Sequence, residues 1–162
     1  MTAPTSLPIR QQIIDAAVAS LKNISIANGY YTDIRSVDEY RKAAYEADDL
    51  PALGVTDLKR DPTATQSCNI DSHILNLAVI VMGSGDDMAA LARQTRLILA
   101  DLEIWLGSEM GPTCPQFDGL VYNYDKSSDD TQFEQLGDCI CSAKWIVPLY
   151  YRHTIFEPQT TI

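Results

Sequence analysis

Few residues of this 162-residue chain have the type and spacing that catalysis requires. His73 and His153 are the only histidines, and either one could act as a general base. A working base also needs a nucleophile or substrate within reach and a group that orients it, and no local sequence around either histidine supplies these. We expect both histidines to lie at strand boundaries, and we expect the chain not to be an enzyme.

Four cysteines are a second possible source of chemistry, as metal ligands or redox groups. No Cys-x-x-Cys pair is present, and the spacing of histidines and cysteines fits no known zinc pattern. In Cys139-Ile140-Cys141 the two sulfurs would lie on the same face of a strand, which suits core packing better than a disulfide. We therefore interpret all four as reduced structural thiols: Cys68, Cys114, Cys139 and Cys141.

Two further patterns could bind ions. The turn Gly83-Ser84-Gly85 joins a predicted strand to a predicted helix, where backbone amides can bind phosphate. It lacks the lysine of a P-loop, and Asp86 and Asp87 stand where the phosphate would lie. The acidic pairs lack the alternation of a calcium-binding loop: they are Asp48-Asp49, Asp86-Asp87 and Asp129-Asp130. We predict a plain turn, solvated acidic loops, no metal and no cofactor.

The charge balance argues against sequence-specific nucleic-acid binding. Twelve Lys and Arg residues stand against 22 Asp and Glu, for a net charge of −10, and the cations are scattered among acids. Such a chain repels phosphates, although an acidic wall suits DNA that slides past without being held. No run approaches ~20 apolar residues, so no membrane span is expected. The first residues lack a basic start and an apolar run, so we expect synthesis in the cytoplasm.

Tyrosine is the aromatic residue that this chain favours, with eight tyrosines against three phenylalanines and two tryptophans. A tyrosine ring gives contact area with a polar tip, which suits a protein interface, although a half-buried position in a strand explains it equally well. The candidate interface residues lie near loop edges and strand ends: Tyr30, Tyr31, Lys59, Arg60, Tyr122, Tyr124, Tyr150 and Tyr151. The loop from Thr56 to Ser67 is a further candidate contact.

Hydrophobic periodicity predicts two main helices. The first begins at Leu7-Pro8, carries Ile9, Ile13 and Leu21 on one side, and should end near Asn28-Gly29. The second should run from Asp86 to Leu106, with acidic caps at its beginning. Its apolar side consists of Met88, Leu91, Thr95, Ile98, Leu102 and Trp105.

Strand signals occupy much of the remaining chain. The run from His73 to Met82 is apolar on both faces and predicts a central strand covered on both sides. Shorter strands are expected after Leu50-Pro51 and over 119–124, with a polar turn over 125–130. The segment 139–151 alternates, and Pro148 places its far end at a sheet edge. Residues 40–46 have helical composition.

This order predicts one α+β domain over residues 1–162, with an extended segment over 1–6 and a tail over 154–162. A mostly antiparallel sheet with both main helices on one face accounts for it.

Three segments resemble tail-terminator and tail-completion (neck) proteins of long-tailed bacteriophages. They are the amphipathic helix from Pro8, the turn Ile24 to Ile34 with its Ala27-Asn28-Gly29-Tyr30 core, and Asp48-Asp49-Leu50-Pro51-Ala52-Leu53. The strand over 73–82 and the helix over 86–106 continue the resemblance, which covers about two thirds of the chain. Residues 36–45 depart from it, because they are charged and helix-like where the family has a clean strand.

The resemblance implies a structural virion protein in the tail or neck, made in the host cytoplasm. A tail terminator forms a hexameric ring that caps the tail tube, contacts the tube protein, and docks to head-completion or connector proteins. DNA would pass through its channel without specific binding. The alternatives are another neck, tail-completion or minor tail protein, and, from a different class, a cytoplasmic adaptor or a small hydrolase.

Overall fold

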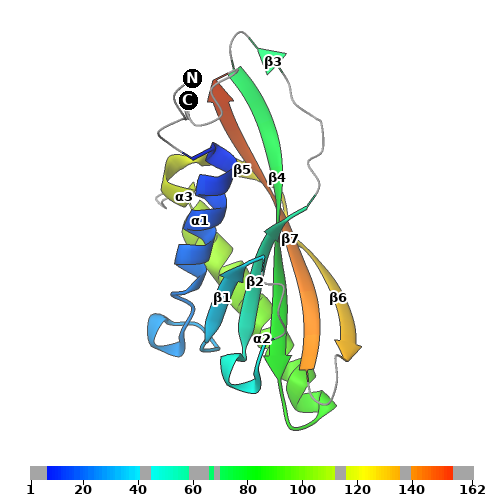
Figure 1. The fold of residues 1–162 in the computed structure, drawn as a ribbon. Coiled ribbons are helices and arrows are strands. Elements are labelled where there is room, and N and C mark those ends of the chain that lie inside the picture. The colour runs from blue at the N-terminus through cyan, green and yellow to red at the C-terminus, as the bar shows by residue number, and fades with distance from the viewer. Residues whose placement is uncertain are drawn as a thin grey trace.

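The computed structural model describes residues 7–40, 45–58, 66–67, 70–111, 116–135 and 140–154. They form an α+β fold in two layers, one sheet and two main helices (Figure 1). The helices and helical turns are α1 (Ile9–Leu21), η1 (Ile26–Asn28), η2 (Ala47–Asp49), α2 (Met88–Met110) and α3 (Gln116–Gly119). The strands are β1 (Ser36–Glu39), β2 (Ala52–Asp57), β3 (Gln66–Ser67), β4 (Ile70–Ser84), β5 (Val121–Tyr124), β6 (Ser128–Gln135) and β7 (Ile140–Thr154).

The sheet is organised around its two longest strands. β4 and β7 have 15 residues each and pair antiparallel from Ile70–Thr154 to Ser84–Ile140. The strand order is β1-β2-β4-β7-β5, and β3 and β6 add short pairings to β4 and β7. Only β1 and β2 run parallel, so the predicted mostly antiparallel sheet is confirmed.

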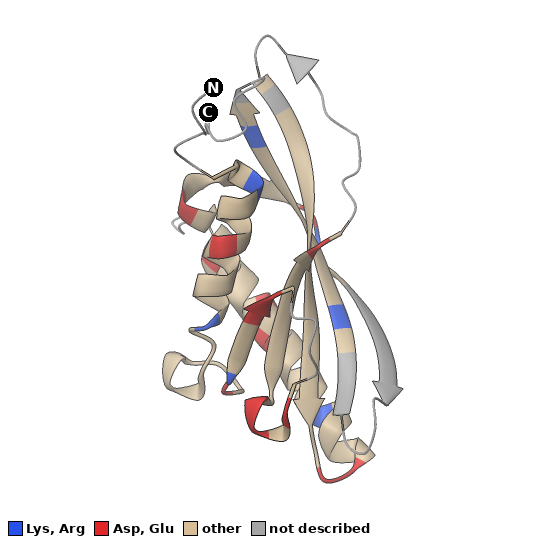
Figure 2. Cartoon of the chain, viewed as in Figure 1, with Lys and Arg blue, Asp and Glu red and all other residues tan. Residues whose placement is uncertain are grey.

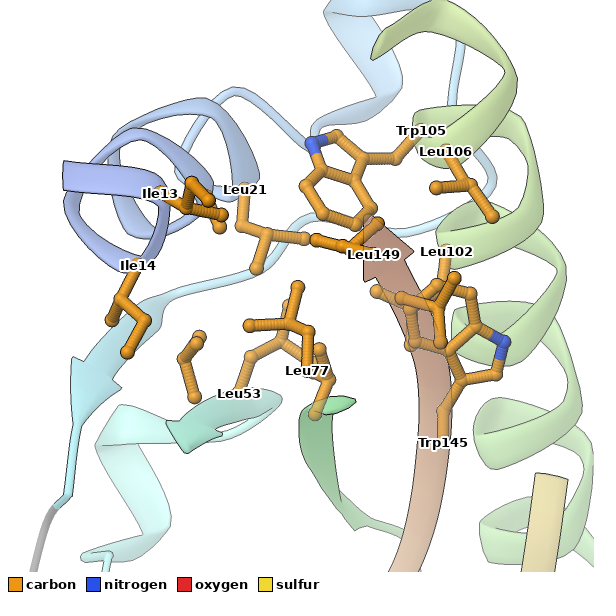
Figure 3. Close-up of a cluster of buried hydrophobic side chains, with 14 of the residues drawn as sticks. Ile13, Ile14, Leu21, Leu53, Leu77, Leu102, Trp105, Leu106, Trp145 and Leu149 are labelled. Atoms are coloured by element: carbon orange, nitrogen blue, oxygen red, sulfur yellow. The ribbon is translucent and has the colours of Figure 1, made fainter. Parts of the chain in front are cut away.

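Both main helices cover the same face of this sheet, as predicted (Figure 1). Alternate residues of a strand point to one face, and on this face β4 contributes Leu75, Leu77, Val79 and Val81. Facing them, α1 buries Ile13 and Leu21, and α2 buries Leu102 and Trp105, the latter against Trp145 of β7 (Figure 3). The helix stripes read from the sequence are correct, except that Met88 is exposed.

The first helix is shorter than predicted. It ends at Leu21, and Asn23 to Ser25 leave the helical path. The predicted stop at Asn28-Gly29 instead ends η1, where Gly29 adopts φ +92°, a conformation that glycine takes without strain. The second helix begins at Met88 and continues beyond Leu106 to Met110, and Asp87 caps it by accepting from the Ala90 amide at 2.7 Å.

Two predictions about the second half of the sheet are wrong. The expected polar turn over 125–130 contains the start of β6, which polar residues hide from a hydrophobicity pattern. Pro148 does not mark a sheet edge, because β7 pairs with β4 on one side and with β5 and β6 on the other. Register pairing with β6 stops at Ile146 and pairing with β5 begins at Leu149, so the proline lies between them and loses no ladder bond.

The segment before β2 contains a strand where the sequence looked helical. Ser36–Glu39 forms β1, which pairs parallel with β2. Of the predicted helical stretch 40–46, residues 41–44 lie outside the described residues, and Tyr40, Tyr45 and Glu46 are not helical. The predicted strand after Pro51 is confirmed as β2.

A buried carboxylate ties the segment after η1 to α2. Asp101 lies in the middle of α2 with no exposed surface, and its oxygens accept from the Tyr31 amide (2.7 Å), the Thr32 amide (2.9 Å) and the Thr32 hydroxyl (2.6 Å). A buried carboxylate is tolerated when hydrogen bonds satisfy it in this way. We call these contacts the Asp101 clamp.

The position of Trp145 in the core gives a first prediction. Its side chain is 1% exposed, packs edge-on against Trp105 at 6.2 Å, and donates from Nε1 to Glu103 at 3.0 Å. Trp145→Ala should lower the free energy of unfolding by about 3–5 kcal/mol. Urea unfolding measures this loss. Ile146→Ala, at the next and half-buried position on the other face, should lose clearly less, and equal losses would contradict the assignment of faces.

The Asp101 clamp gives a second prediction. Asp101→Ala leaves the part-buried Tyr31 amide and the buried Thr32 amide and hydroxyl without their acceptor, so the free energy of unfolding should fall by about 2–5 kcal/mol. A matched control is Asp33→Ala, which removes an exposed carboxylate that accepts one amide, from Ile26, and should cost about 1 kcal/mol. If both variants have the same urea midpoint of unfolding, the Asp101 clamp stabilises the fold no more than the hydrogen bond of Asp33 does.

Candidate functional site

The face of the sheet opposite the helices carries apolar residues that the helices do not cover. We call it the open face, defined by outward residues of β2, β4 and β7: Gly54, Thr56, Ile74, Ala78, Ile80, Ile146, Pro148 and Tyr150. Among these, Ala78 is buried and the others are half-buried. The central strand was predicted to be covered on both faces, and this is wrong over most of the described part of β4.

An aromatic and cationic cluster lies where β5 meets β7 on the open face. The Tyr122 ring lies 6.3 Å from the Tyr150 ring, and the Arg152 guanidinium carbon lies 4.1 Å from the Tyr122 ring centre. Tyr150 donates its hydroxyl to Asp125 at 2.5 Å, which fixes the ring. Tyrosine and arginine together are the residue types most enriched at the energetic centres of protein interfaces.

A hollow of about 220 Å³ lies at the other end of the open face. Its lining includes Tyr40, Tyr45, Gly54, Ile80 and Met82. Tyr45 is buried beside Leu50 and Ala52 and covers the lower end of β2. The hollow is mainly apolar and matches one aliphatic side chain better than a polar ligand.

Most of the charged residues that the structure describes lie away from the open face (Figure 2). Acidic residues gather on the helices and on loops such as η2 and the turn before α2, whereas the long strands are mostly uncharged. Of the described side chains on the open face of β4 and β7, only Lys144 and Arg152 carry a charge. Asp38 lies on the same face, at the β1 edge of the sheet.

The tyrosines predicted as interface residues do not form one surface. Tyr122 (43% exposed) and Tyr150 share the open face, whereas Tyr124 (39% exposed) lies on the helix side, in a hollow with Glu103 and Leu106. Tyr31 is 61% exposed beside the Asp101 clamp, and Tyr30 is half-buried against the core.

Three of the other predicted contacts offer no described surface. Tyr151 is only 5% exposed and packs into the core, so it presents little surface to a partner. Lys59 and Arg60, with most of the predicted contact loop, lie outside the described residues. The cysteine side chains also lie outside them.

The two histidines considered for catalysis lie side by side near the paired ends of β4 and β7. His73 was expected at a strand boundary, but it lies within β4 and is 3% exposed. Its ring stacks on His153 at 4.5 Å and lies 5.3 Å from the Tyr151 ring, so packing neighbours surround it. His153 lies near the end of β7, as predicted.

The turn Gly83-Ser84-Gly85 packs closely against the first residues of α2, as expected for a plain turn. A Cβ atom at Gly85 would lie 2.7 Å from the Leu91 amide nitrogen, and one at Gly83 would lie 2.7 Å from Gln94 Oε1. That same Oε1 accepts from the Ser84 amide at 2.7 Å. The turn can therefore lie close against α2 because Gly83 and Gly85 have no side chains.

The acidic pairs differ in their surroundings. Asp49 closes a capping box with Glu46 around η2, and Asp87 caps α2. The side chains of Asp129 and Asp130 lie outside the described residues. Among the side chains that the structure describes, no three His, Cys, Asp or Glu groups come together as metal ligands. No described helix is long and apolar enough to cross a membrane.

Sequence reasoning missed the open face and the role of Arg152. A strand that is apolar on both faces is typical of a doubly covered position, and only the placement of the helices shows that one face is bare. Arg152 gave no signal of its own, because its contact with Tyr122 joins strands 30 residues apart in sequence. Alternation in 139–151 did correctly place Trp145, Val147 and Leu149 on one face.

The hydrogen bond from Tyr150 gives a pH prediction. The bond to Asp125, then partial burial and the charge of Asp125, raise the pKa of the Tyr150 phenol above its usual value of 10.0. The unfolded chain therefore loses this proton first, so the contribution to stability is complete below pH 10 and falls as pH rises toward the raised pKa. The ultraviolet absorbance of phenolate can be titrated with pH in the wild type and in Tyr150→Phe. The difference between the two curves should show one tyrosine that ionises at a higher pH than an ordinary tyrosine. Asp125→Asn should shift it to lower pH, and no shift would contradict the assigned cause.

Comparisons with known proteins give little guidance. No protein-family model matches the chain, and no curated protein matches it. Among solved structures, a chain from the "Virion of native gene transfer agent (GTA) particle" is similar with a TM-score of 0.40 and 10% sequence identity. The match covers 91% of this chain and 96% of that chain. A similarity this low carries no assignment of fold or function.

Proposed function

We propose that this chain is a structural subunit of a phage tail, the tail terminator, which assembles into a hexameric ring on the tail tube. The observation that carries the proposal is the open face. It is a long, largely uncharged sheet surface with an aromatic and arginine cluster, and the described part of the chain leaves it without a helical cover. Extended apolar surfaces of this kind are typical of interaction sites.

The residues of the family resemblance support the proposal through their structural roles. The segment Ile24 to Ile34 folds into η1, the Gly29 turn and the Asp101 clamp, which together hold a rigid corner beside α2. Asp33 accepts from the Ile26 amide at 2.8 Å within the same corner. The motif thus specifies a shape that displays Tyr31 and Ile26 at the surface.

The charge distribution fits a ring around DNA. The chain carries a net charge of −10, and most of the acidic side chains that the structure describes lie on helices and loops, away from the open face of β4 and β7. An acidic channel wall would release no counterions from passing DNA and so would not hold it. Tail tube protein on one side of the ring and connector proteins on the other are the partners that this role requires.

Another neck or minor tail protein remains the second candidate, because the same open face would serve it. A ring distinguishes the two, since a terminator closes on itself through a heterologous contact repeated around one axis. A cytoplasmic adaptor would stay monomeric and would be absent from particles.

The first test of the proposal is the solution mass of the purified chain by light scattering, followed by electron microscopy of large species. We expect closed rings with a central hole, and gold-labelled antibody should mark the head-proximal end of the tail in particles. Label elsewhere on the particle would favour the second candidate. A chain that is absent from particles would refute both.

A matched pair of tyrosines tests whether the open face forms the ring. Tyr122 and Tyr124 are similarly exposed but lie on opposite faces of the sheet. Tyr122→Ala should reduce the fraction of chains in rings by about tenfold at a fixed concentration, because it removes a central aromatic contact. Tyr124→Ala should leave the fraction unchanged, and the reverse result would move the contact to the helix side. Unchanged melting temperatures would show that both variants fold.

A further inference from the structure

Two oppositely charged surfaces lie on opposite sides of the sheet at the level of β5. On the open face, Arg152 is exposed, and its guanidinium lies over the exposed ring of Tyr122. On the helix side, α1, α3 and the end of α2 surround a hollow of about 240 Å³. We call it the acidic hollow, because Glu109 and Asp118 are among the residues that line it. Since α3 leads directly into β5, one short segment contributes to both surfaces (Figure 1).

The acidic hollow holds one of its carboxylates in a fixed position. The Ser20 hydroxyl donates to Glu109 Oε1 at 2.7 Å, and Trp105 Nε1 in turn donates to Ser20 Oγ. These bonds tie Glu109 to the core, because Trp105 is buried. Asp118 is exposed beside it. A carboxylate that is already ordered loses little conformational freedom when a cationic group binds it.

The charged groups of both surfaces lack partners of opposite charge within the described part of the chain. The one ion pair there joins Arg10 to Asp57. Arg152 stacks on Tyr122 through the face of its guanidinium, which leaves the N–H groups at the edge available to donate. A guanidinium edge matches a carboxylate through two parallel hydrogen bonds. Each surface therefore presents what the other one needs.

We propose that the Tyr122 and Arg152 side chains of one copy dock in the acidic hollow of the next copy, and that this contact repeats around the ring. The proposal rests on the ring of the proposed function, and it names the surface that the open face binds there. Arg152 donates to Glu109 and Asp118 of the neighbouring copy. The Tyr122 ring lies against the small alanine side chains that α1 contributes to the hollow.

The positions of the two surfaces suit a closed ring. They are different surfaces on opposite sides of one molecule, as a heterologous contact requires. Both lie at the level of β5 along the sheet, where α1 and α3 face the helix side (Figure 1). Each step around the ring then needs little shift along the strands. A large shift at every step would give an open filament instead.

Charge complementarity selects a second copy over other occupants of the hollow. The chain is strongly acidic, so two copies repel each other over most of their surfaces. The open face is an exception, since the described charges on its β4 and β7 positions are those of Lys144 and Arg152. An acidic helix side that meets this face converts a repulsion into an attraction. DNA phosphates are excluded from the hollow by its carboxylates.

Reversing one charge on each surface tests the contact. Arg152→Glu and Glu109→Lys each bring like charges together at every contact, so each should lower the fraction of chains in rings by about tenfold or more. Position 109 lies in the last turn of α2, where a cation suits the helix dipole, so this variant should fold. Arg96→Glu is the matched control, at an exposed position about 20 Å along α2 from Glu109, and should leave the rings intact. Melting temperatures check that all variants fold.

Mixing the two disrupted variants gives a sharper test. When Arg152→Glu chains alternate with Glu109→Lys chains, one contact keeps the original pair and the next joins the two introduced charges in the opposite order. An equal mixture should therefore form rings that neither variant forms alone. Native mass spectrometry should find equal numbers of the two chains in each ring. A mixture that stays without rings would overturn the proposal.

Further outcomes separate this contact from the tail role. Wild-type rings that tolerate both single variants would overturn the contact and leave the tail role standing. Rings restored by mixing, in a chain that is absent from phage particles, would refute the tail role and leave the contact standing. A wild type that forms no rings would overturn the contact, while antibody labelling of particles would still decide the tail role.

Discussion

The pairing of β4 with β7 is the constraint on which the rest of the structure depends. Fifteen residues of each strand are joined in one register, and every other strand except β1 pairs with one of the two. That register sets which side chains point toward the helices. Because both helices lie on the same side, the main core gathers there, and the opposite face keeps mostly half-buried residues beside a small buried cluster around Tyr45 and Leu50. The bare surface is therefore a consequence of strand register and helix placement together.

The Asp101 clamp gives the turn from Ile24 to Ile34 a structural role. Thr32 and Tyr31 lie in the segment that carries the resemblance to phage tail proteins, and both donate to one buried carboxylate about 70 residues away. Nothing in the local sequence of α2 distinguishes Asp101 from a solvent-facing acid. Its burial follows from its position on the helix, between Ile98 and Leu102 on the stripe that packs against the sheet.

Sequence patterns predicted those parts of the fold in which one physical signal dominates. Helical periodicity located α1 and α2, and alternation located β7, because packing on a single core face enforces each pattern. Sequence patterns failed for β6, because it begins with the polar residues Ser-Asp-Asp. They also failed at Pro148, which suggested a sheet edge although it lies between the pairings of β7 with β6 and with β5. The candidate surface was foreseen only as separate tyrosines. Which of them share a face depends on the bulge between Val121 and Asn123, which no spacing rule predicts.

The division of the outer side of β7 between two short strands has a consequence for solubility. A long, flat strand edge offers unpaired amides and carbonyls to any other chain and can seed fibrous aggregates. Here β5 has four residues, β6 has eight and is interrupted by an irregularity, and β1 on the opposite edge has four. The two longest strands, which would be the most hazardous templates, have a partner strand on both sides over much of their length. A chain built this way can accumulate to a high concentration while its edges resist indiscriminate strand addition.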